Sequence, residues 1–450
     1  MNAKIRNKKS MGKVYNQFDL IKTKIEKKDF KVGVIGLGYV GLPLTLTFCE
    51  KGLEVIGFDI NEEYLIKLRK GESYIHHIKS ERIYKQIRNK ALFPTSDFSN
   101  ISNTDVIIIC VPTPLTSHRE PDIRYILSTM ESLKPFLKKG QILILESTTY
   151  PGTTEEIIKP VLEDIGFTVG EDIFLVYSPE REDPGNKEYN SQNTPKILGG
   201  ITSKCSTIGE MTYKTIIQNI VVVSSTKVAE MTKLVENVHR AVNIGLVNEL
   251  KTLTDSLGVD IYEVINAAAT KPFGFTPFYP GPGLGGHCIP IDPFYLSWKA
   301  KEFDINLKFI ELAGEINSSM PNYILNKIST LLNQKSKSLK DSKILILGLS
   351  YKKNVDDIRE SPSLKLIKLL LKADAKVSFS DPFHNAIPKS RNYNFKIKSV
   401  KINPKNLQDF DCVVLTTDHD DFDYEMIRIH SPLIIDTRGK FNLSKKVMRG

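Results

Sequence analysis

A repeated alternation of short apolar runs and helical stretches is the feature that most restricts how this chain can fold. From Lys31 onward, six runs are almost continuous Val, Ile and Leu, the composition of strands buried on both faces of a sheet. These runs are Val32–Gly36, Glu54–Asp59, Asp105–Val111, Gln141–Glu146, Ile173–Tyr177 and Asn219–Val223. Buried strands separated by helices predict an α/β fold with a doubly wound parallel sheet.

A second alternation of the same kind follows a polar linker, Asn333–Asp341. Its runs are Lys343–Gly348, Lys376–Ser380, Cys412–Thr416 and Leu433–Asp436. Its opening, KILILGLSYK, shares four of ten residues with KVGVIGLGYV at the start of the first alternation, and it keeps Gly348. We interpret it as a second Rossmann-like domain with a different ligand, although any buried strand that enters a helix has a similar pattern.

A long helix is expected between the two alternations. From about Thr226 to Leu257 the apolar residues recur with a helical period. At about 1.5 Å per residue, this helix is about 50 Å long, which suits a bridge between domains or an oligomer interface. A Gly/Pro-dense loop, Lys271 to Pro293, and further helices to about Leu332 follow it.

The positive charge of the chain is concentrated at its N-terminus. The net charge is +10, but residues 1–31 hold ten Lys/Arg and three Asp/Glu, so only +3 remains for the rest. Nucleic-acid binding needs a basic patch on the fold itself, and we therefore expect no nucleic-acid partner. We assign the basic N-terminal extension no function and expect it to be disordered.

The apolar runs and the cysteine spacing indicate the compartment in which the chain is expected. No apolar run approaches the ~18–20 residues that span a bilayer, and the basic extension lacks the apolar core of a secretory signal. The five cysteines are scattered, at 49, 110, 205, 288 and 412. This spacing argues against a disulfide framework or a metal site, and it favours a reducing cytoplasm without a membrane partner.

A glycine-rich turn follows the first buried strand. Gly36, Gly38 and Gly41 form G-x-G-x-x-G between that strand and a helix, and Asp59 ends the next strand. Gly36 makes the turn, Gly38 lets backbone approach a pyrophosphate, and Gly41 allows close packing. Asp59 is placed to accept from a ribose hydroxyl and would repel a 2′-phosphate, so NAD is favoured over NADP. The alternative is a turn without a ligand.

The most unusual stretch is Gly281-Pro-Gly-Leu-Gly-Gly-His-Cys288-Ile-Pro-Ile-Asp292. Glycines let a ligand approach the backbone closely, and such a loop can expose a thiol. Most lone cysteines are small core residues, however, so the catalytic interpretation of Cys288 stays open on this pattern alone.

Two further sets of polar residues are candidates. Lys233 and Asn237 share one helix face and could bind an oxyanion, but their spacing fits a solvated stripe better. Glu180 and Ser147–Thr148 follow buried strands, at the sheet edge where ligands of open α/β folds bind.

With these motifs in order, the chain resembles the nucleotide-sugar 6-dehydrogenase family, the UDP-glucose and GDP-mannose dehydrogenases, over nearly its whole length from Lys31. The matching motifs are G-x-G-x-x-G, Val111-Pro-Thr-Pro114, Glu146-Ser-Thr148, Ser178-Pro-Glu180, Lys233-Leu-x-x-Asn237, Gly-Gly-x-Cys288 and Lys352…Asp357-x-Arg359-Glu-Ser. Within the family, the stretches around Glu180 and Cys288 are similar to the N-acetylhexosamine branch, most closely to its UDP-N-acetylglucosamine 6-dehydrogenases.

The resemblance implies an NAD-dependent, four-electron oxidation of a sugar C6 alcohol to a carboxylate. By that analogy Cys288 forms a thiohemiacetal and then a thioester, for which a thiolate is well suited. The implied catalytic residues are Cys288, Lys233, Asn237, Asp292, Glu180 and Thr148. The implied cofactor residues are Gly36, Gly38, Tyr39, Val40, Gly41, Asp59, Pro112, Thr113, Ser147 and Arg359. The implied substrate residues are Glu180, Arg181, Lys233, Asn237, Tyr279, Gly281, Gly283, Lys352 and Arg438.

The resemblance also bears on the substrate. The UDP-glucose branch usually carries Lys where this chain has Ile291, which puts UDP-glucose in doubt. UDP-N-acetylglucosamine is the expected substrate, and the N-acetylmannosamine, N-acetylgalactosamine and glucose derivatives are alternatives. More remote alternatives are a two-electron β-hydroxyacid dehydrogenase and a non-catalytic nucleotide-binding protein.

These inferences give an expected domain plan and assembly. The plan is a basic extension at 1–30, an NAD-binding Rossmann domain at 31–225, a central helical domain at 226–332 and a UDP-sugar-binding Rossmann-like domain at 341–450. A homo-oligomer, a dimer or a multiple of dimers, is expected with the long helix at its centre.

Overall fold

The structure is a computed structural model that describes residues 16–75, 78–116, 118–181, 193–286, 289–389 and 393–450. The chain divides into two compact units. The first ends at Thr113 and resumes as Ile123–Met231, and the second comprises Pro114–Asp122 and Thr232–Gly450.

The first unit contains an eight-stranded sheet of order β3-β2-β1-β4-β5-β6-β7-β8. The strands are β1 (Lys31–Ile35), β2 (Glu54–Phe58), β3 (Leu92–Thr95), β4 (Val106–Ile109), β5 (Ile142–Leu145), β6 (Phe174–Tyr177), β7 (Lys196–Gly200) and β8 (Ile220–Val222). Neighbouring strands are parallel except β6 and β7, which are antiparallel. The expected α/β class with a largely parallel sheet is confirmed.

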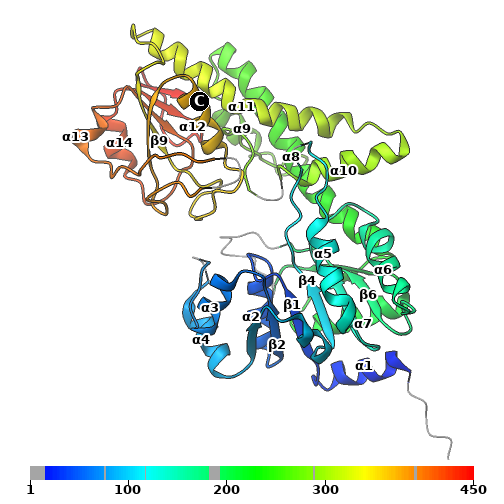
Figure 1. Cartoon of the computed structure of the whole chain (residues 1–450). Coiled ribbons are helices and arrows are strands. Elements are labelled where there is room, and N and C mark those ends of the chain that lie inside the picture. Colours follow the sequence, from blue (N-terminus) through cyan, green and yellow to red (C-terminus); the bar gives the residue numbers. More distant parts are fainter. Residues whose placement is uncertain (1–15, 76–77, 117, 182–192, 287–288, 390–392) are drawn as a thin grey trace, which may run out of the picture. The chain divides into compact units, whose positions relative to one another are not determined.

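Helices connect the strands of this unit, and Figure 1 shows them around the sheet. The α-helices are α1 (Gln17–Glu26), α2 (Gly41–Glu50), α3 (Glu62–Arg69), α4 (Ser80–Arg88), α5 (Arg124–Leu133), α6 (Lys159–Asp164) and α7 (Ser203–Lys214). Shorter turns of helix are η1 (Phe98–Asn103), η2 (Lys134–Phe136) and the π-helical η3 (Thr154–Ile158).

Helix α1 departs from the disorder expected of the N-terminal extension. Ile21 and Ile25 are buried one turn apart in the core of the first unit, so the helix has an apolar face to dock. Lys24 Nζ lies 2.7 Å from Asp105 Oδ1, and the Asp105 carboxylate also accepts from the Lys31 N–H. Asp105 directly precedes β4, so α1 covers the amino ends of the strands (Figure 1).

Helix α8 (Thr226–Leu257) has the bounds that the apolar period predicted, and it continues from the first unit into the second. The other helices of the second unit are α9 (Ile261–Ala268), α10 (Asp292–Ala300), η4 (Lys301–Phe303), α11 (Lys308–Asn333), α12 (Pro362–Lys372), α13 (Pro404–Leu407) and α14 (Tyr424–His430). Within the described ranges, none of the helices combines the length and the apolar character that crossing a bilayer requires.

Helices α8 and α11 pack closely because their contact residues are small. A Cβ added at Gly245 would lie 3.1 Å from the Cβ of Ala313. Beside this crossing, the Asn317 side chain donates to the Ala241 carbonyl and accepts from Asn248 Nδ2. Asn248 Oδ1 in turn accepts from the Gly281 N–H at 3.0 Å. The helix pair therefore fixes the start of the glycine-rich loop.

The second sheet has five parallel strands in the order β10-β9-β11-β12-β13. They are β9 (Lys343–Leu347), β10 (Lys376–Ser380), β11 (Cys412–Leu415), β12 (Ile434–Asp436) and β13 (Val447–Arg449). The first four lie where the second alternation predicted them, and α11 ends at Asn333, where the linker was expected. This confirms the second parallel sheet.

Candidate active site

The glycine-rich turn has the geometry that a dinucleotide needs. Gly36 has a φ of +88°, and a Cβ added there would lie 2.6 Å from the Cys110 carbonyl oxygen. A Cβ on Gly41 would lie 1.8 Å from the Gly36 oxygen, whereas nothing lies within 4 Å of one on Gly38. Backbone conformation and packing thus account for Gly36 and Gly41, and the space over Gly38 is open for a ligand.

Asp59 lies at this turn, as predicted. Its Oδ2 accepts from the Leu37 N–H at 2.8 Å, and its Oδ1 accepts from the Asn61 N–H at 2.9 Å. Each carboxylate oxygen can accept a second hydrogen bond, so the side chain suits a ribose hydroxyl. Tyr74, which the sequence did not single out, donates its hydroxyl to the Leu37 carbonyl and stacks on Tyr64 at 4.0 Å between ring centroids. These residues fit NAD at the start of α2.

The remaining predicted cofactor residues of the first unit flank the same edge of the sheet. Val40 is the residue before α2, and Tyr39 packs against the core of the unit. Thr113 is buried, and Ser147 Oγ donates to the Val111 carbonyl at 2.8 Å. Pro112 lies between Val111 and Thr113 in the same segment.

Thr148 and Glu180 lie near each other in the fold because they follow neighbouring strands. Leu145 of β5 pairs with Tyr177 of β6, so the two segments leave the sheet side by side. Both side chains are half-buried. Glu180 Oε1 accepts from the Arg181 N–H at 2.8 Å, and Arg181 Nη1 donates to the Pro195 carbonyl at 2.6 Å.

Lys233 and Asn237 are not a solvated stripe, which corrects the interpretation that their spacing favoured. Lys233 is 8% exposed and Asn237 is 1% exposed, because this face of α8 turns inward. Asn237 Nδ2 donates to Asp292 Oδ2, and Arg240 Nη2 donates to Asn237 Oδ1 at 2.7 Å. The spacing alone could not show this, because the residue that covers the face, Asp292, lies more than fifty positions away.

Asp292 has an unusual environment for a carboxyl group. It opens α10, it is 2% exposed, and burial raises its pKa to about 6 against the opposing effects of Lys233, Asn237 and Arg240. A group with this pKa exchanges protons close to neutral pH. The cluster of Lys233, Asn237 and Asp292 can therefore bind a developing oxyanion and hold or release a proton.

The described part of the glycine-rich loop contacts the segment between β9 and α12 within the second unit. The Gly286 N–H donates to the Arg359 carbonyl at 3.0 Å, and Gly283 has a φ of +124°. A Cβ on Gly285 would lie 2.5 Å from the Tyr351 Cβ, so only glycine fits there. Cys288, the predicted nucleophile, lies outside the described residues.

Predicted substrate residues gather at the start of this loop. Tyr262 donates its hydroxyl to the carbonyls of Pro280 and Thr437, which joins the loop to the segment of Arg438. A Cβ on Gly281 would lie 3.0 Å from an Arg438 guanidinium nitrogen. Tyr279 stacks on Tyr262 and donates its hydroxyl to Asn266.

Lys352 and Arg359 lie between β9 and α12. Lys352 is half-buried. The Arg359 guanidinium forms a fork-like pair with Asp357, with Nε at 3.0 Å and Nη2 at 2.7 Å from carboxylate oxygens. The predicted residues thus form two sets, one in each unit. The residues in the first unit are those of the glycine turn, Asp59, Pro112, Thr113, Ser147, Thr148, Glu180 and Arg181, and those in the second include Lys233, Asn237, Tyr279, Gly281, Gly283, Asp292, Lys352, Arg359 and Arg438.

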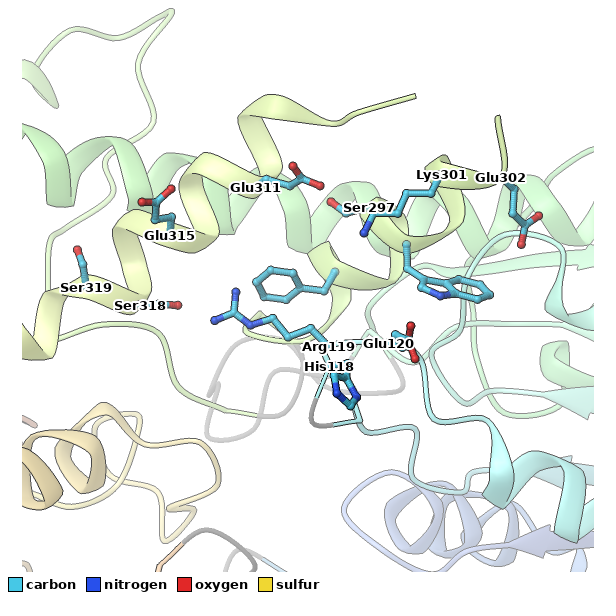
Figure 2. Close-up of a pocket in the computed structure, with 12 residues that line it drawn as sticks. His118, Arg119, Glu120, Ser297, Lys301, Glu302, Glu311, Glu315, Ser318 and Ser319 are labelled. Carbon is cyan, nitrogen blue, oxygen red and sulfur yellow. The ribbon is translucent and has the colours of Figure 1, made fainter. Parts of the chain in front are cut away.

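Two of the cavities in the described part of the second unit are lined by residues of α10 and α11. One, of about 670 Å³, is lined by Ile289, Pro290 and Ile291, which follow Cys288, and by Arg359. The other, of about 910 Å³, contains none of the predicted site residues. Figure 2 shows Glu311 and Glu315 along one helix of this second cavity, with Arg119 and His118 on the segment that faces them. We assign catalysis to neither cavity.

Comparison with known proteins shows the family. Residues 30–217, 227–319 and 345–442 match, in turn, the NAD binding domain, the central domain and the UDP binding domain of the UDP-glucose/GDP-mannose dehydrogenase family. The chain is 34% identical over 397 residues to the UDP-N-acetyl-D-glucosamine 6-dehydrogenase of Pseudomonas aeruginosa, covering 88% of this chain and 92% of that one. It is 32% identical over 433 residues to the UDP-N-acetyl-D-mannosamine dehydrogenase of Methanocaldococcus jannaschii, covering 93% and 95%.

Solved structures agree with the sequence matches. A UDP-D-ManNAc dehydrogenase from Pyrococcus horikoshii has a TM-score of 0.82 at 30% identity, covering 92% of this chain and 96% of that one. The UDP-N-acetyl-mannosamine dehydrogenase Cap5O from Staphylococcus aureus has a TM-score of 0.78 at 33% identity, covering 93% and 97%. These matches confirm the predicted resemblance and NAD as the cofactor. The chain therefore belongs to the UDP-glucose/GDP-mannose dehydrogenase family, with an NAD-binding domain and a UDP-binding domain.

Proposed function

We propose that this protein oxidises the C6 alcohol of a UDP-N-acetylhexosamine, UDP-N-acetylglucosamine above the others, to the uronic acid. The observation that carries the proposal is the buried cluster of Lys233, Asn237 and Asp292, whose carboxyl has a pKa of about 6, four residues after Cys288. A carboxyl group with only a structural role does not need to be buried at the end of the loop that contains Cys288. Carboxyl groups whose pKa is shifted in this way are common at catalytic sites.

The proposed reaction balances as one alcohol, two NAD⁺ and one water giving one carboxylate, two NADH and three protons. NAD held at the glycine turn and Asp59 would supply the hydride acceptor for each of two oxidations at C6. Between them the Cys288 thiolate adds to the aldehyde carbon, and the carbonyl oxygen becomes an alkoxide and takes up a proton. The second oxidation leaves a thioester, and water then breaks its C–S bond and releases the thiolate. The covalent bond keeps the aldehyde from escaping.

Each residue of the cluster has a proposed role in this reaction. Lys233 stabilises negative charge on the sugar oxygen, and Asn237 holds the oxyanion while it fixes Asp292. Asp292 accepts and returns a proton, which its pKa of about 6 allows near neutral pH. Thr148 and Glu180 position and deprotonate the water, and Lys352 and Arg438 bind the UDP-sugar.

The choice of sugar rests on the relatives and on Ile291. Relatives that span most of this chain act, by their names, on UDP-N-acetyl-D-glucosamine or UDP-N-acetyl-D-mannosamine. Ile291 is buried before α10 and lines a cavity together with Ile289 and Pro290, and the UDP-glucose branch usually has a charged lysine at this position. We therefore place UDP-glucose behind the N-acetylhexosamine derivatives.

The test is to measure NADH formed per sugar consumed for UDP-N-acetylglucosamine, its N-acetylmannosamine and N-acetylgalactosamine counterparts, and UDP-glucose. The proposal predicts two NADH per sugar, with the highest kcat/KM for UDP-N-acetylglucosamine. One NADH per sugar would indicate a two-electron dehydrogenase, and no turnover with any of them would indicate a non-catalytic nucleotide-binding protein. Either result would overturn the proposal.

We also propose that the protein acts as a homodimer or a multiple of dimers in the cytoplasm. Four leucines of α8 are exposed at helical spacing, at 40% to 66%: Leu246, Leu250, Leu253 and Leu257. An exposed apolar stripe of this length is typical of an interface between subunits. The four cysteines of the described chain are free thiols, which fits a reducing compartment.

A further inference from the structure

A buried ion pair lies at the sheet edge that carries Thr148 and Glu180. Lys196 Nζ is 2.9 Å from Glu146 Oε1, and the two side chains are 7% and 0% exposed. Tyr213 donates its hydroxyl to the same Glu146 oxygen, and Lys196 Nζ lies 4.7 Å from the centre of the Tyr213 ring. The family motifs include Glu146 but neither Lys196 nor Tyr213.

The direction of β7 explains how Lys196 reaches this edge. Tyr177 pairs with Gly199 and Val176 with Gly200, so β7 runs opposite to β6. The amino end of β7 therefore meets the carboxyl ends of β5 and β6. A parallel strand would place Lys196 at the other end of the sheet. The one antiparallel pairing among the described strands of this sheet thus delivers an ammonium group to the edge where ligands bind.

Three contacts tie the start of β7 to the segment that contains Glu180. Lys196 Nζ donates to the Pro179 carbonyl at 3.4 Å, directly before Glu180. Ser178 Oγ donates to the Ile197 carbonyl at 2.7 Å, and Arg181 donates to the Pro195 carbonyl at 2.6 Å. Glu146 lies two positions before Thr148. The Lys196–Glu146 pair therefore joins the segments of Thr148 and Glu180.

Stability does not explain this pair. Burying two charges costs more than burying apolar residues of the same volume, and such a replacement is often neutral or stabilising. The second oxygen, Glu146 Oε2, is buried and has no hydrogen-bond partner among the described residues. Burial disfavours the charged form of Lys196, but Glu146 and Glu180 outweigh it and its pKa is raised. The charge is thus held by both carboxylates.

We propose that Lys196 is a positioning residue for the hydrolytic half of the reaction, holding Glu180 and Thr148 in the arrangement that activates water. This rests on the proposed function, in which a thioester forms at Cys288. In that step water adds to the acyl carbon and passes a proton to Glu180, and the C–S electron pair returns to sulfur. Lys196 touches neither substrate nor cofactor in this account, so it affects hydrolysis and leaves the two oxidations largely unchanged.

The test compares Lys196→Met, Lys196→Arg and the double variant Glu146→Gln/Lys196→Met. The double variant removes both charges together, so it leaves no unpaired buried charge if the single variant fails to fold. Lys204→Met is the matched control, since Lys204 forms an exposed pair with Glu171 at 2.7 Å in the same unit. Each is assayed for the NADH burst of a single turnover, for steady-state kcat and KM, and for sugar bound to Cys288 by mass spectrometry.

We expect the double variant to keep the burst of two NADH and a KM within threefold. Its steady-state kcat should fall at least tenfold, with the acyl adduct accumulating on Cys288. Lys196→Arg should restore kcat to within threefold, and Lys204→Met should match the wild type. A wild-type kcat in the double variant, or an equal loss in the burst and the steady state, would overturn the inference. Failure of the proposed function itself would appear in the wild type, as one NADH per sugar or as no uronic acid formed.

Discussion

At the scale of single residues, Asp292 illustrates how a buried position changes the chemistry of a common side chain. Its carboxyl is surrounded by Lys233, Asn237 and Arg240, all of which favour the charged form, yet burial outweighs them and raises the pKa to about 6. A carboxylate in water would be fully ionised at neutral pH and a poor proton donor. The burial therefore gives this site a group that works in both directions near neutral pH.

The pKa of Asp292 predicts the acid side of the pH profile. Below about pH 6 the carboxyl is protonated and cannot accept a proton, so kcat should fall with an apparent pKa close to 6. Asp292→Asn should lose that limb and lower kcat by about 100-fold or more. The measurement is kcat between pH 5 and pH 9 for both proteins. A wild-type profile that is flat from pH 5 to pH 8 would contradict the role.

The raised pKa of Asp292 also predicts that the charged form of this carboxyl destabilises the folded protein, although activity requires that form. The folded protein binds the Asp292 proton more tightly than the unfolded chain does, so burying the charged form costs about 3 kcal/mol at pH 8. That cost becomes smaller as the pH falls towards the ordinary pKa of an aspartate side chain. Asp292→Asn should therefore be more resistant to urea than the wild type at pH 8, by less at pH 5. Equal midpoints at both pH values would argue against it.

Substitutions at the glycines of the cofactor turn distinguish effects on packing from effects on NAD binding. Gly38→Ala meets open space, so it should keep the wild-type melting temperature while NAD affinity falls at least tenfold. Gly41→Ala places a Cβ 1.8 Å from the Gly36 oxygen and should lower both. Calorimetric titration with NAD and thermal unfolding measure the two effects. Undiminished NAD affinity in Gly38→Ala would show that the cofactor lies elsewhere.

At the scale of elements, different faces of α8 make different contacts. Glu230, Lys233 and Asn237 lie on one buried face, three and seven positions apart. The Glu230 carboxylate accepts from the Gly152 N–H, the Thr154 N–H and the Thr154 hydroxyl. It therefore anchors the segment after Thr148 to the helix that continues to Lys233.

Removing the Glu230 anchor should destabilise the protein. Glu230→Ala leaves two buried N–H groups without an acceptor, each of which costs about 1–3 kcal/mol. We expect a loss of about 2–4 kcal/mol in the free energy of unfolding, measured by urea denaturation. Glu249→Ala, at an exposed position of the same helix, is the control and should change it by less than about 0.5 kcal/mol. A similar small change in both variants would show that the anchor contributes little.

The apolar periodicity of the sequence predicted many of the helices and strands, and those that it missed have physical reasons. The strands with continuous Val/Ile/Leu stand out because they are buried on both faces, and the long helix stands out because its apolar residues recur with a helical period. Strand β7 does not, because Lys196, Gly199 and Gly200 break its apolar run, and no local pattern encodes an antiparallel direction. Helix α1 was missed because Ile21 and Ile25 are few among many lysines, and their burial depends on the sheet they meet.

Sequence motifs predicted part of the candidate site. The features that depend on contacts between residues far apart in the chain could not be predicted. The glycine turn and Asp59 follow from their spacing alone. The burial of Lys233 and Asn237 depends on Asp292, which approaches from a distant loop. Lys196 and Glu230 act through partners far along the chain, so nothing in their own neighbourhoods marks them.

At the scale of the whole molecule, the exposed stripe of α8 predicts an oligomer. Leu246, Leu250 and Leu253 present apolar side chains that are 51%, 40% and 54% exposed. Light scattering at micromolar concentration should give the mass of a dimer or a multiple of dimers. Leu253→Arg should lower that mass to the monomer, because a buried unpaired charge disfavours association. A monomeric wild type would exclude the proposed interface.

The central claim for the whole molecule is that the sugar is held covalently by Cys288 between two oxidations. Substitution of that sulfur tests it most directly. Cys288→Ala is assayed with UDP-N-acetylglucosamine and NAD for uronic acid by mass spectrometry, and its NAD affinity is measured alongside. NAD binding should be unchanged, and uronic acid formation should fall at least 1,000-fold. Uronic acid formed by Cys288→Ala at the wild-type rate would contradict it.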